Sequence, residues 1–128
     1  MSLVTPLNRV LGLGSAKDGT EHWWGQRLSA VALAVLGIWL TLSVVAFESF
    51  TYAAVVSWAQ SPFNRVMLIL TVLTLSYHSQ LGVQMVVEDY VHAAGLKIGT
   101  LIASTFVHIL LAATGAFALL KLAFGAGA

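Results

Sequence analysis

Three long uncharged runs dominate the pattern of hydrophobic and polar positions along this chain. They cover residues 28–47, 66–87 and 98–120, and each is bordered by a basic residue. A helix of about 20 apolar residues crosses the hydrocarbon core of a bilayer, and basic side chains at its ends reach the lipid headgroups. The pattern therefore predicts an all-α membrane protein with three transmembrane helices.

The segments between these runs are a polar N-terminal segment, an outer loop, a cytoplasmic loop and a tail, at residues 1–27, 48–65, 88–97 and 121–128. Within the outer loop, the apolar stretch at residues 51–60 is predicted to form a short helix in the membrane interface. Ser61 and Pro62 suit the N-cap and the first position of the second long helix. Gly95 is predicted to be a helix stop signal that precedes the third long helix.

The basic residues favour one orientation of the helices. If the N-terminus lies inside, four basic residues are cytoplasmic and two are outside, namely Arg9, Lys17, Arg27 and Lys97 against Arg65 and Lys121. This distribution follows the rule that positively charged loops stay in the cytoplasm. We therefore expect an up-down-up arrangement with a cytoplasmic N-terminus. The start of the chain resembles neither a cleavable signal peptide nor a transit peptide, which favours a bacterial inner membrane.

Composition excludes several classes of function. The chain is 59% hydrophobic and only 9% charged, whereas a soluble domain carries about 25% charged residues. Six basic and five acidic residues nearly cancel, which gives no basis for nucleic-acid binding. The absence of cysteine excludes iron–sulfur ligation and covalent haem attachment by this chain. Because three helices bury little of one another, we expect helices of a partner to pack against them.

A polar spine runs along the second apolar run. His78, Gly82, Met85 and Asp89 recur at offsets of four, seven and eleven residues, which return to one face of a helix. His78 is predicted near mid-membrane, and the adjacent Asp89 and Tyr90 at the cytoplasmic surface, about 16 Å away along the helix axis. A buried ligand aligned with hydrogen-bonding groups at the interface is an arrangement for redox cofactors.

The residues alone leave two interpretations of His78 open. A histidine within a bilayer needs a partner, which is either a hydrogen-bonding group of another helix or a metal or haem iron. Gly82 favours haem, because it leaves a flat notch that a porphyrin or a partner helix can approach. A second axial ligand would come from His108, at a similar depth on the third helix, or from another membrane subunit. In the latter case His108 is a packing or hydrogen-bonding residue.

The surface groups also have two interpretations. A quinone needs hydrogen-bond donors at its carbonyls and a source of protons, which the Tyr90 hydroxyl and the Asp89 carboxylate can supply. The alternative is an ordinary helix end with an interfacial tyrosine. Arg27 and Ser29 open the first long helix at the same level. Arg27 is expected to pair with Asp89, to bind a haem propionate, or to extend towards the headgroups.

Two stretches of the chain resemble a known family. The sequence GLGSAKDGTEHWWGQRLSA at residues 12–30 resembles the start of the D-type hydrophobic membrane anchor subunit of succinate dehydrogenase in alphaproteobacteria-like bacteria. The later sequence HSQLG, which begins at His78, and the triplet Glu88-Asp89-Tyr90 are similar to the haem-ligand and quinone-site pattern of that family. The specific part is the spacing of eleven residues from histidine to Asp-Tyr.

The resemblance implies a role for each candidate residue. His78 would be one axial ligand of haem b, and a histidine of a second three-helix anchor, the cytochrome b556-type C subunit, would be the other. Tyr90 would hydrogen-bond a ubiquinone carbonyl with support from Asp89. Three further residues would lie near the haem propionates or the quinone pocket, namely Arg27, Ser29 and Gly82. The family pattern requires no histidine at position 108, which favours the packing interpretation of His108.

The resemblance also implies a division of labour within a complex. Succinate would be oxidised at FAD in a flavoprotein subunit, and electrons would pass through the clusters of an iron–sulfur subunit to ubiquinone. This chain would anchor the soluble pair, contribute to the quinone site and ligate the haem, without carrying out the dehydrogenation. The alternatives are an anchor of a fumarate reductase, a haem-free proton-relay or accessory subunit of a transporter, and a structural assembly factor.

Overall fold

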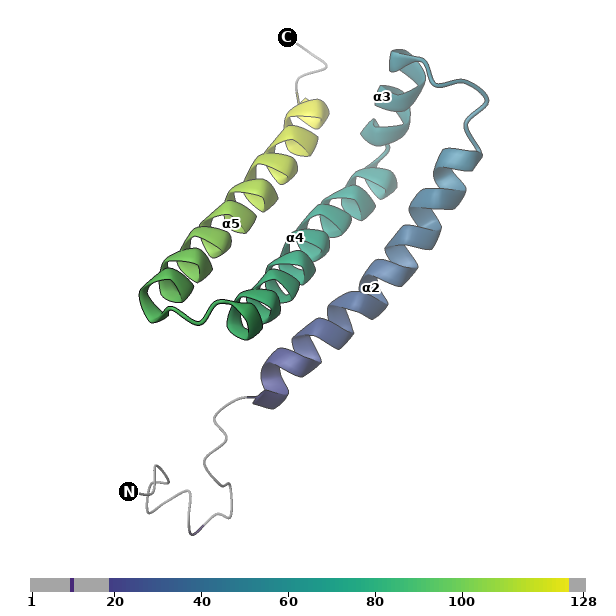
Figure 1. The fold of residues 1–128 in the computed structure, drawn as a ribbon. Coiled ribbons are helices and arrows are strands. Elements are labelled where there is room, and N and C mark those ends of the chain that lie inside the picture. Colours follow the sequence, from purple (N-terminus) through teal and green to yellow (C-terminus); the bar gives the residue numbers. More distant parts are fainter. Residues whose placement is uncertain (1–9, 11–18, 125–128) are drawn as a thin grey trace.

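The computed structural model describes residues 10 and 19–124, and the regular elements within residues 19–124 are four helices. They are α2 (Gly19–Val45), α3 (Tyr52–Gln60), α4 (Pro62–Tyr90) and α5 (Ala94–Phe124). Figure 1 shows the chain rising along α2, turning through the short α3, descending along α4 and rising again along α5. α2, α4 and α5 are long and apolar enough to cross a membrane. The prediction of three transmembrane helices is confirmed at this level.

The long helices extend beyond the uncharged runs that predicted them. α2 begins at Gly19, inside the segment predicted as a polar N-terminal region, and ends at Val45 rather than residue 47. α4 and α5 exceed the predicted runs at both ends. The physical reason is that charged side chains at the membrane surface are solvated by headgroups and water while their backbone stays helical. Uncharged length therefore measures the membrane-spanning part and not the whole helix.

The turn between α4 and α5 corrects one detail of the sequence prediction. Gly95 lies in the first turn of α5, so its prediction as a stop signal is wrong. The chain reverses within residues 91–93, where Val91 has an extended backbone. Lys97 closes this turn, because its Nζ donates to the backbone oxygen of Glu88 at 2.8 Å.

The predicted interfacial helix is present as α3. Thr51 precedes it in an extended conformation, and its Oγ1 accepts a hydrogen bond from the Ala54 amide at 3.3 Å, as an N-cap does. Ser61 occupies the N-cap position of α4, as predicted, although its side chain makes no capping hydrogen bond. Pro62 follows at the start of the helix, where its missing amide proton is not needed.

An aromatic cluster joins three helices at this end of the molecule. Trp39 of α2 stacks on Trp58 of α3, with their ring centroids 5.7 Å apart. Phe63 of α4 packs edge-on against Trp39, and Phe47 packs against Trp58. Gln60 adds a link to α5, because its side-chain amide donates to the backbone oxygen of Leu122 at 3.3 Å. The short helix is therefore held against the ends of all three long helices.

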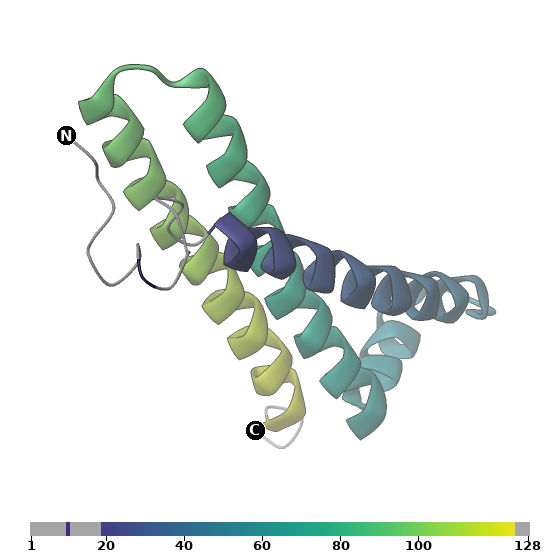
Figure 2. The same cartoon turned by 90° about the horizontal axis from the view of Figure 1, so that it is seen from below.

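α4 is the central helix. It packs against both α2 and α5, whereas these two have no close backbone approach to each other within the described residues. Figure 2 shows α4 and α5 side by side, with α2 crossing them steeply. Gly115 allows the close approach of α5, because a Cβ atom there would lie 2.7 Å from Cγ1 of Val72. Small residues at such contacts are typical of helices that pair in membranes.

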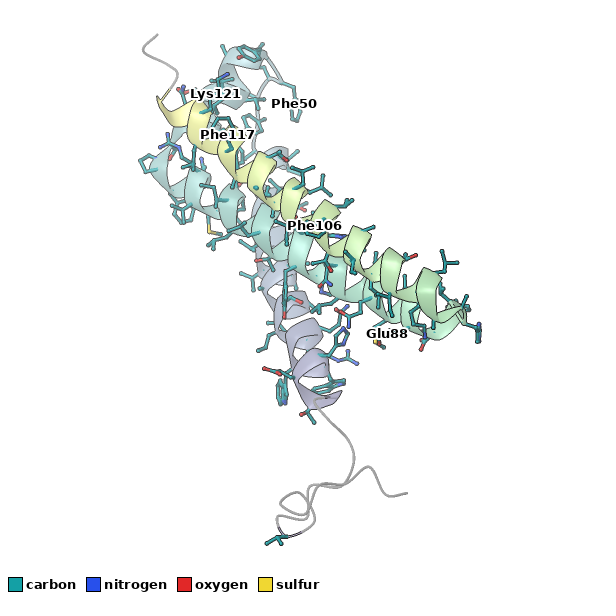
Figure 3. The ribbon with its side chains drawn as sticks, turned by 90° about the vertical axis from the view of Figure 1, so that its left-hand side faces the viewer. Phe50, Glu88, Phe106, Phe117 and Lys121 are labelled. Carbon is teal, nitrogen blue, oxygen red and sulfur yellow. The ribbon has the colours of Figure 1, made fainter. Side chains whose placement is uncertain are left out.

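The helices leave most of their apolar surface uncovered. The buried residues in the described part of the chain are Ser29, Leu36, Ala59, Leu81 and Val87. Phe106 and Phe117 of α5 are 69% and 68% exposed, and Figure 3 shows both along that helix, between Lys121 and the end where Glu88 of α4 is labelled. In a membrane this surface contacts lipid or helices of other subunits. The cytoplasmic location of the N-terminus stays a prediction, and Arg9 and Lys17, on which it partly depends, lie outside the described residues.

Candidate functional site

α2 and α4 meet at His78. Oγ of Ser29 lies 2.9 Å from Nδ1 of His78, and Nε2 of Gln26 lies 3.4 Å from Nε2 of the same ring. Gln26 and Ser29 are three residues apart on α2 and therefore share one face of that helix. Both nitrogens of the imidazole thus contact α2. Ser29 is the buried polar residue of the described chain, with 6% of its surface exposed.

The Ser29 hydroxyl determines which nitrogen of the imidazole carries a proton. The hydroxyl lies 2.7 Å from the backbone oxygen of Gly25 and 3.1 Å from that of Gln26. A hydroxyl has one proton, and when Ser29 donates it to either of these carbonyls, its oxygen accepts from His78. This assigns the proton of His78 to Nδ1 and the lone pair to Nε2. The amide of Gln26 then donates to Nε2, and at 3.4 Å this bond exceeds the usual range of about 2.7–3.2 Å and is weak.

Gly25 allows α2 to approach α4 beside this contact. A Cβ atom at Gly25 would lie 2.7 Å from Oη of Tyr77 and 3.3 Å from Cδ1 of Leu81. Leu81 is buried one turn from His78. The two helices therefore touch around the imidazole, and the contact positions Gln26 and Ser29 on the ring.

The flank of α4 beside Gly82 is open. A Cβ atom at Gly82 would have no neighbour within 4 Å. A hollow of about 360 Å³ lies here, lined by His78, Ser79, Gly82, Val83 and Val86. This geometry matches the flat notch expected at Gly82. Apart from the imidazole and one hydroxyl, its lining is apolar.

His108 forms hydrogen bonds with residues of α4 and of its own helix. Its Nδ1 is 2.7 Å from the backbone oxygen of Ser104, and its Nε2 is 3.1 Å from Oγ of Ser79 on α4. Nδ1 therefore donates to the carbonyl and Nε2 accepts from the Ser79 hydroxyl. The two histidines thus have different hydrogen-bond partners, His78 on α2 and His108 on α4.

Asp89 and Tyr90 lie at the end of α4. Tyr90 is the last residue of the helix and is 78% exposed. Asp89 is also exposed. The Arg27 side chain lies over the ring of Trp23 at 5.5 Å in a cation–π contact. The ion pair between Arg27 and Asp89, one of three roles expected for Arg27, is not formed within the described residues.

Two polar features of the structure were not predicted from the sequence. Gln26 was not singled out, although its spacing of three residues from Ser29 is the signal that both face the same helix. The other is a ladder at every fourth residue of α4. The Gln84 amide donates to Oε1 of Glu88 at 2.8 Å, and the Gln80 amide approaches Oε1 of Gln84 at 3.5 Å. Residues three and four apart are neighbours on a helix, so the sequence contained this pattern too.

Comparison with known proteins decides the family. The pattern described as the succinate dehydrogenase/fumarate reductase transmembrane subunit matches residues 1–121. The chain belongs to this family. A protein of Rickettsia bellii named succinate dehydrogenase hydrophobic membrane anchor subunit is 34% identical over 97 residues, which cover 76% of this chain and 78% of the relative. Proteins of the same name from Rickettsia conorii and Paracoccus denitrificans are 37% identical over 79 residues and 29% identical over 126 residues.

These relatives confirm the resemblance found in the sequence. The Paracoccus denitrificans alignment covers 98% of this chain and 97% of the relative, and the Rickettsia conorii alignment covers 61% and 63%. The chain is a membrane anchor subunit of succinate dehydrogenase and part of an oxidoreductase complex. As an anchor it associates with other subunits of that complex and with the bilayer. Three apolar helices fit a multi-pass protein of the bacterial inner membrane.

Proposed function

We propose that this anchor subunit supplies His78 as one axial ligand of haem b and supplies Tyr90 and Asp89 to a site where ubiquinone is reduced. His78 is one of the residues that line the hollow beside Gly82. The observation that carries the proposal is the contact of 2.9 Å between Nδ1 of His78 and the Ser29 hydroxyl, from which we assign the proton to Nδ1 and the lone pair to Nε2. A histidine that ligates haem iron needs this combination of one protonated, hydrogen-bonded nitrogen and one nitrogen with a lone pair.

The surroundings of His78 fit a haem in two further respects. Nε2 of His78 contacts the Gln26 amide at 3.4 Å, which is a long and weak hydrogen bond. Its replacement by a bond to iron would therefore cost little free energy. The hollow beside Gly82 is mainly apolar, and all of its lining residues belong to α4. When bound, a haem with two histidine ligands stores one electron and leaves no open coordination position for oxygen.

The second axial ligand is proposed to come from another molecule. Nε2 of His108 already accepts from Ser79 on α4, so its ligation to iron would break this interhelical hydrogen bond. The large uncovered apolar surface of this chain supports a neighbour of similar kind. We assign that neighbour as the second three-helix anchor, the cytochrome b556-type C subunit, with the haem between the two chains.

Tyr90 and Asp89 are proposed to act at the cytoplasmic surface. The Tyr90 hydroxyl, on a side chain that is 78% exposed, donates a hydrogen bond to a quinone carbonyl. The Asp89 carboxylate beside it relays protons from water to the reduced quinone. Arg27 has five N–H donors in a fixed plane, which suits a haem propionate near the start of α2. Residues of the other subunits complete this site.

The names of the relatives support one direction of electron flow. The family description covers both succinate dehydrogenase and fumarate reductase, whereas the relatives compared here are named as succinate dehydrogenase anchors. We therefore favour succinate oxidation at FAD in the flavoprotein subunit and transfer through an iron–sulfur subunit to ubiquinone. The present chain anchors these subunits and takes no part in the dehydrogenation step.

A redox difference spectrum of the assembled complex tests the haem proposal. The wild-type complex is expected to give a reduced b-type band, and His78→Leu is expected to lose it while the soluble subunits still oxidise succinate with an artificial acceptor. His108→Leu is the matched control and should keep the band. A wild-type complex without haem, or an unchanged band in His78→Leu, would overturn the assignment and favour a haem-free anchor.

A further inference from the structure

We infer that Ser29 is a positioning residue for His78, whose hydroxyl oxygen accepts the Nδ1 proton and so presents the Nε2 lone pair for ligation. This inference deepens the proposed function and rests on it. Ser29 lies on a different helix from the ligand, 49 residues earlier in the chain. It is nevertheless the buried polar group at the contact of the two helices.

The hydrogen bonds of Ser29 to its own helix fit an acceptor role of the hydroxyl towards the imidazole. Serine in a transmembrane helix commonly donates back to the carbonyl four residues earlier, and Ser29 does so with Gly25 at 2.7 Å. With its proton committed to the backbone, the oxygen retains lone pairs, and His78 Nδ1 lies 2.9 Å from them. The serine is thus an acceptor held in place by its own helix.

Gln26 makes this positioning necessary. Its Oε1 is buried and has no hydrogen-bond partner within the described residues, while its Nε2 contacts the histidine. If the side-chain amide rotated by half a turn, Oε1 would face Nε2 of His78 and would accept a proton from it. The opposite tautomer, with the proton on Nε2, therefore has a partner in reach. That tautomer has no lone pair on Nε2 and does not bind iron through this nitrogen.

Ser29 and Gln26 thus favour opposite tautomers of one ring. The Ser29 bond at 2.9 Å has ordinary length, whereas the Gln26 contact at 3.4 Å is long. In the wild-type chain the serine prevails. Removing its oxygen leaves Nδ1–H without a partner, which favours movement of the proton to Nε2 and capture of that proton by the Gln26 oxygen.

The test measures haem content per complex and the haem midpoint potential in the complete complex carrying Ser29→Ala, Ser29→Thr or the double change S29A/Q26L. Loss of a hydrogen-bond partner behind a ligating histidine weakens cofactor binding by roughly 10- to 100-fold, and we expect this for Ser29→Ala. The potential should rise, because a histidine that donates no hydrogen bond is a weaker electron donor. Ser29→Thr keeps the hydroxyl and should restore both readouts.

The double variant separates the tautomer argument from a packing effect. S29A/Q26L removes the oxygen that captures the Nε2 proton, so haem retention should recover partly relative to S29A alone. Thr105→Ala is the matched control, because Thr105 is exposed on α5 and donates only to the Leu101 carbonyl of its own helix. It should leave haem content and potential unchanged.

The outcomes distinguish this inference from the proposed function. Wild-type haem content and potential in Ser29→Ala, together with loss of haem in His78→Leu, would overturn the role of Ser29 alone. Retention of haem in His78→Leu would overturn both. If Ser29→Ala does not assemble, Ser29→Cys gives the same test with a weak acceptor of similar size, and wild-type readouts in that variant would also refute the inference.

Discussion

Nε2 of His108 lies 3.1 Å from Oγ of Ser79, the residue that directly follows His78 on α4. Two consecutive residues of the central helix α4 therefore form hydrogen bonds with two different helices. His78 contacts α2 through Ser29, and Ser79 contacts α5 through His108. Because neighbouring residues on a helix point in directions about 100° apart, one helix carries both contacts at the same depth.

The first prediction concerns the contact between His108 and Ser79. We expect His108→Leu and Ser79→Ala each to destabilise the complex slightly, since an interhelical hydrogen bond in a membrane protein contributes about 0.6 kcal/mol on average. The double variant should lose no more than the larger single loss, because both changes remove one interaction. Thermal inactivation measures the effect. A clearly additive loss would show that the two residues act separately.

The second prediction concerns the close approach of α5 to α4. Gly115→Ala places a Cβ atom 2.7 Å from Cγ1 of Val72, a short and stiff side chain, so the helices must separate. Overpacking of this kind costs about 1–3 kcal/mol, and the melting temperature of the complex should fall accordingly. Gly99→Ala is the control, because a Cβ atom there has no neighbour within 4 Å. Equal melting temperatures for both variants would contradict this packing.

The third prediction concerns the Tyr90 hydroxyl. Tyr90→Phe should lower the rate of ubiquinone reduction by at least several-fold while succinate oxidation with an artificial acceptor stays at the wild-type level, because the change removes one donor and keeps the ring. Tyr52→Phe is the matched control, since Tyr52 is equally exposed, at 83%, at the opposite end of the helices. Parallel loss of both activities in Tyr90→Phe would argue for a structural role instead.

The fourth prediction concerns the aromatic cluster. Trp39→Leu and Trp58→Leu should couple in a double-mutant cycle by about 0.5–1.5 kcal/mol, the range for a stacked aromatic pair. The readout is the free energy of unfolding in detergent. A parallel cycle of Trp24→Leu with Trp58→Leu should give no coupling, because Trp24 packs against Trp23 on α2. Coupling in the second cycle would mean that the changes act through general loosening of the bundle.

The sequence was sufficient to predict the three long helices. Uncharged length determines which segments cross a membrane, and spacing along one helix determines that His78 and Gly82 share a face. The helix ends were predicted less well, because charge alone does not stop a helix at a solvated surface. Gly95 is a second example. It lies within the first turn of α5, because the Lys97 amide donates to the Ala93 carbonyl and the helix has already begun.

The hydrogen-bond partners of His78 on α2 could not be predicted from the sequence. Gln26 lies 52 residues from the histidine, and its contact depends on the steep crossing of α2 over α4. Local periodicity contains no information about that crossing. Tyr90 and Asp89 are a different case, because their proposed function depends on groups of other subunits. For them the family resemblance, and not the geometry of this chain, supplied the assignment.

The scarcity of buried residues has a consequence for assembly. With five buried positions in the described chain, of which one is polar, the mutual orientation of the three long helices depends on few internal contacts. Each helix is stable in lipid through its own backbone hydrogen bonds. A docking subunit can therefore adjust the angle between α2 and α4 at a small energetic penalty.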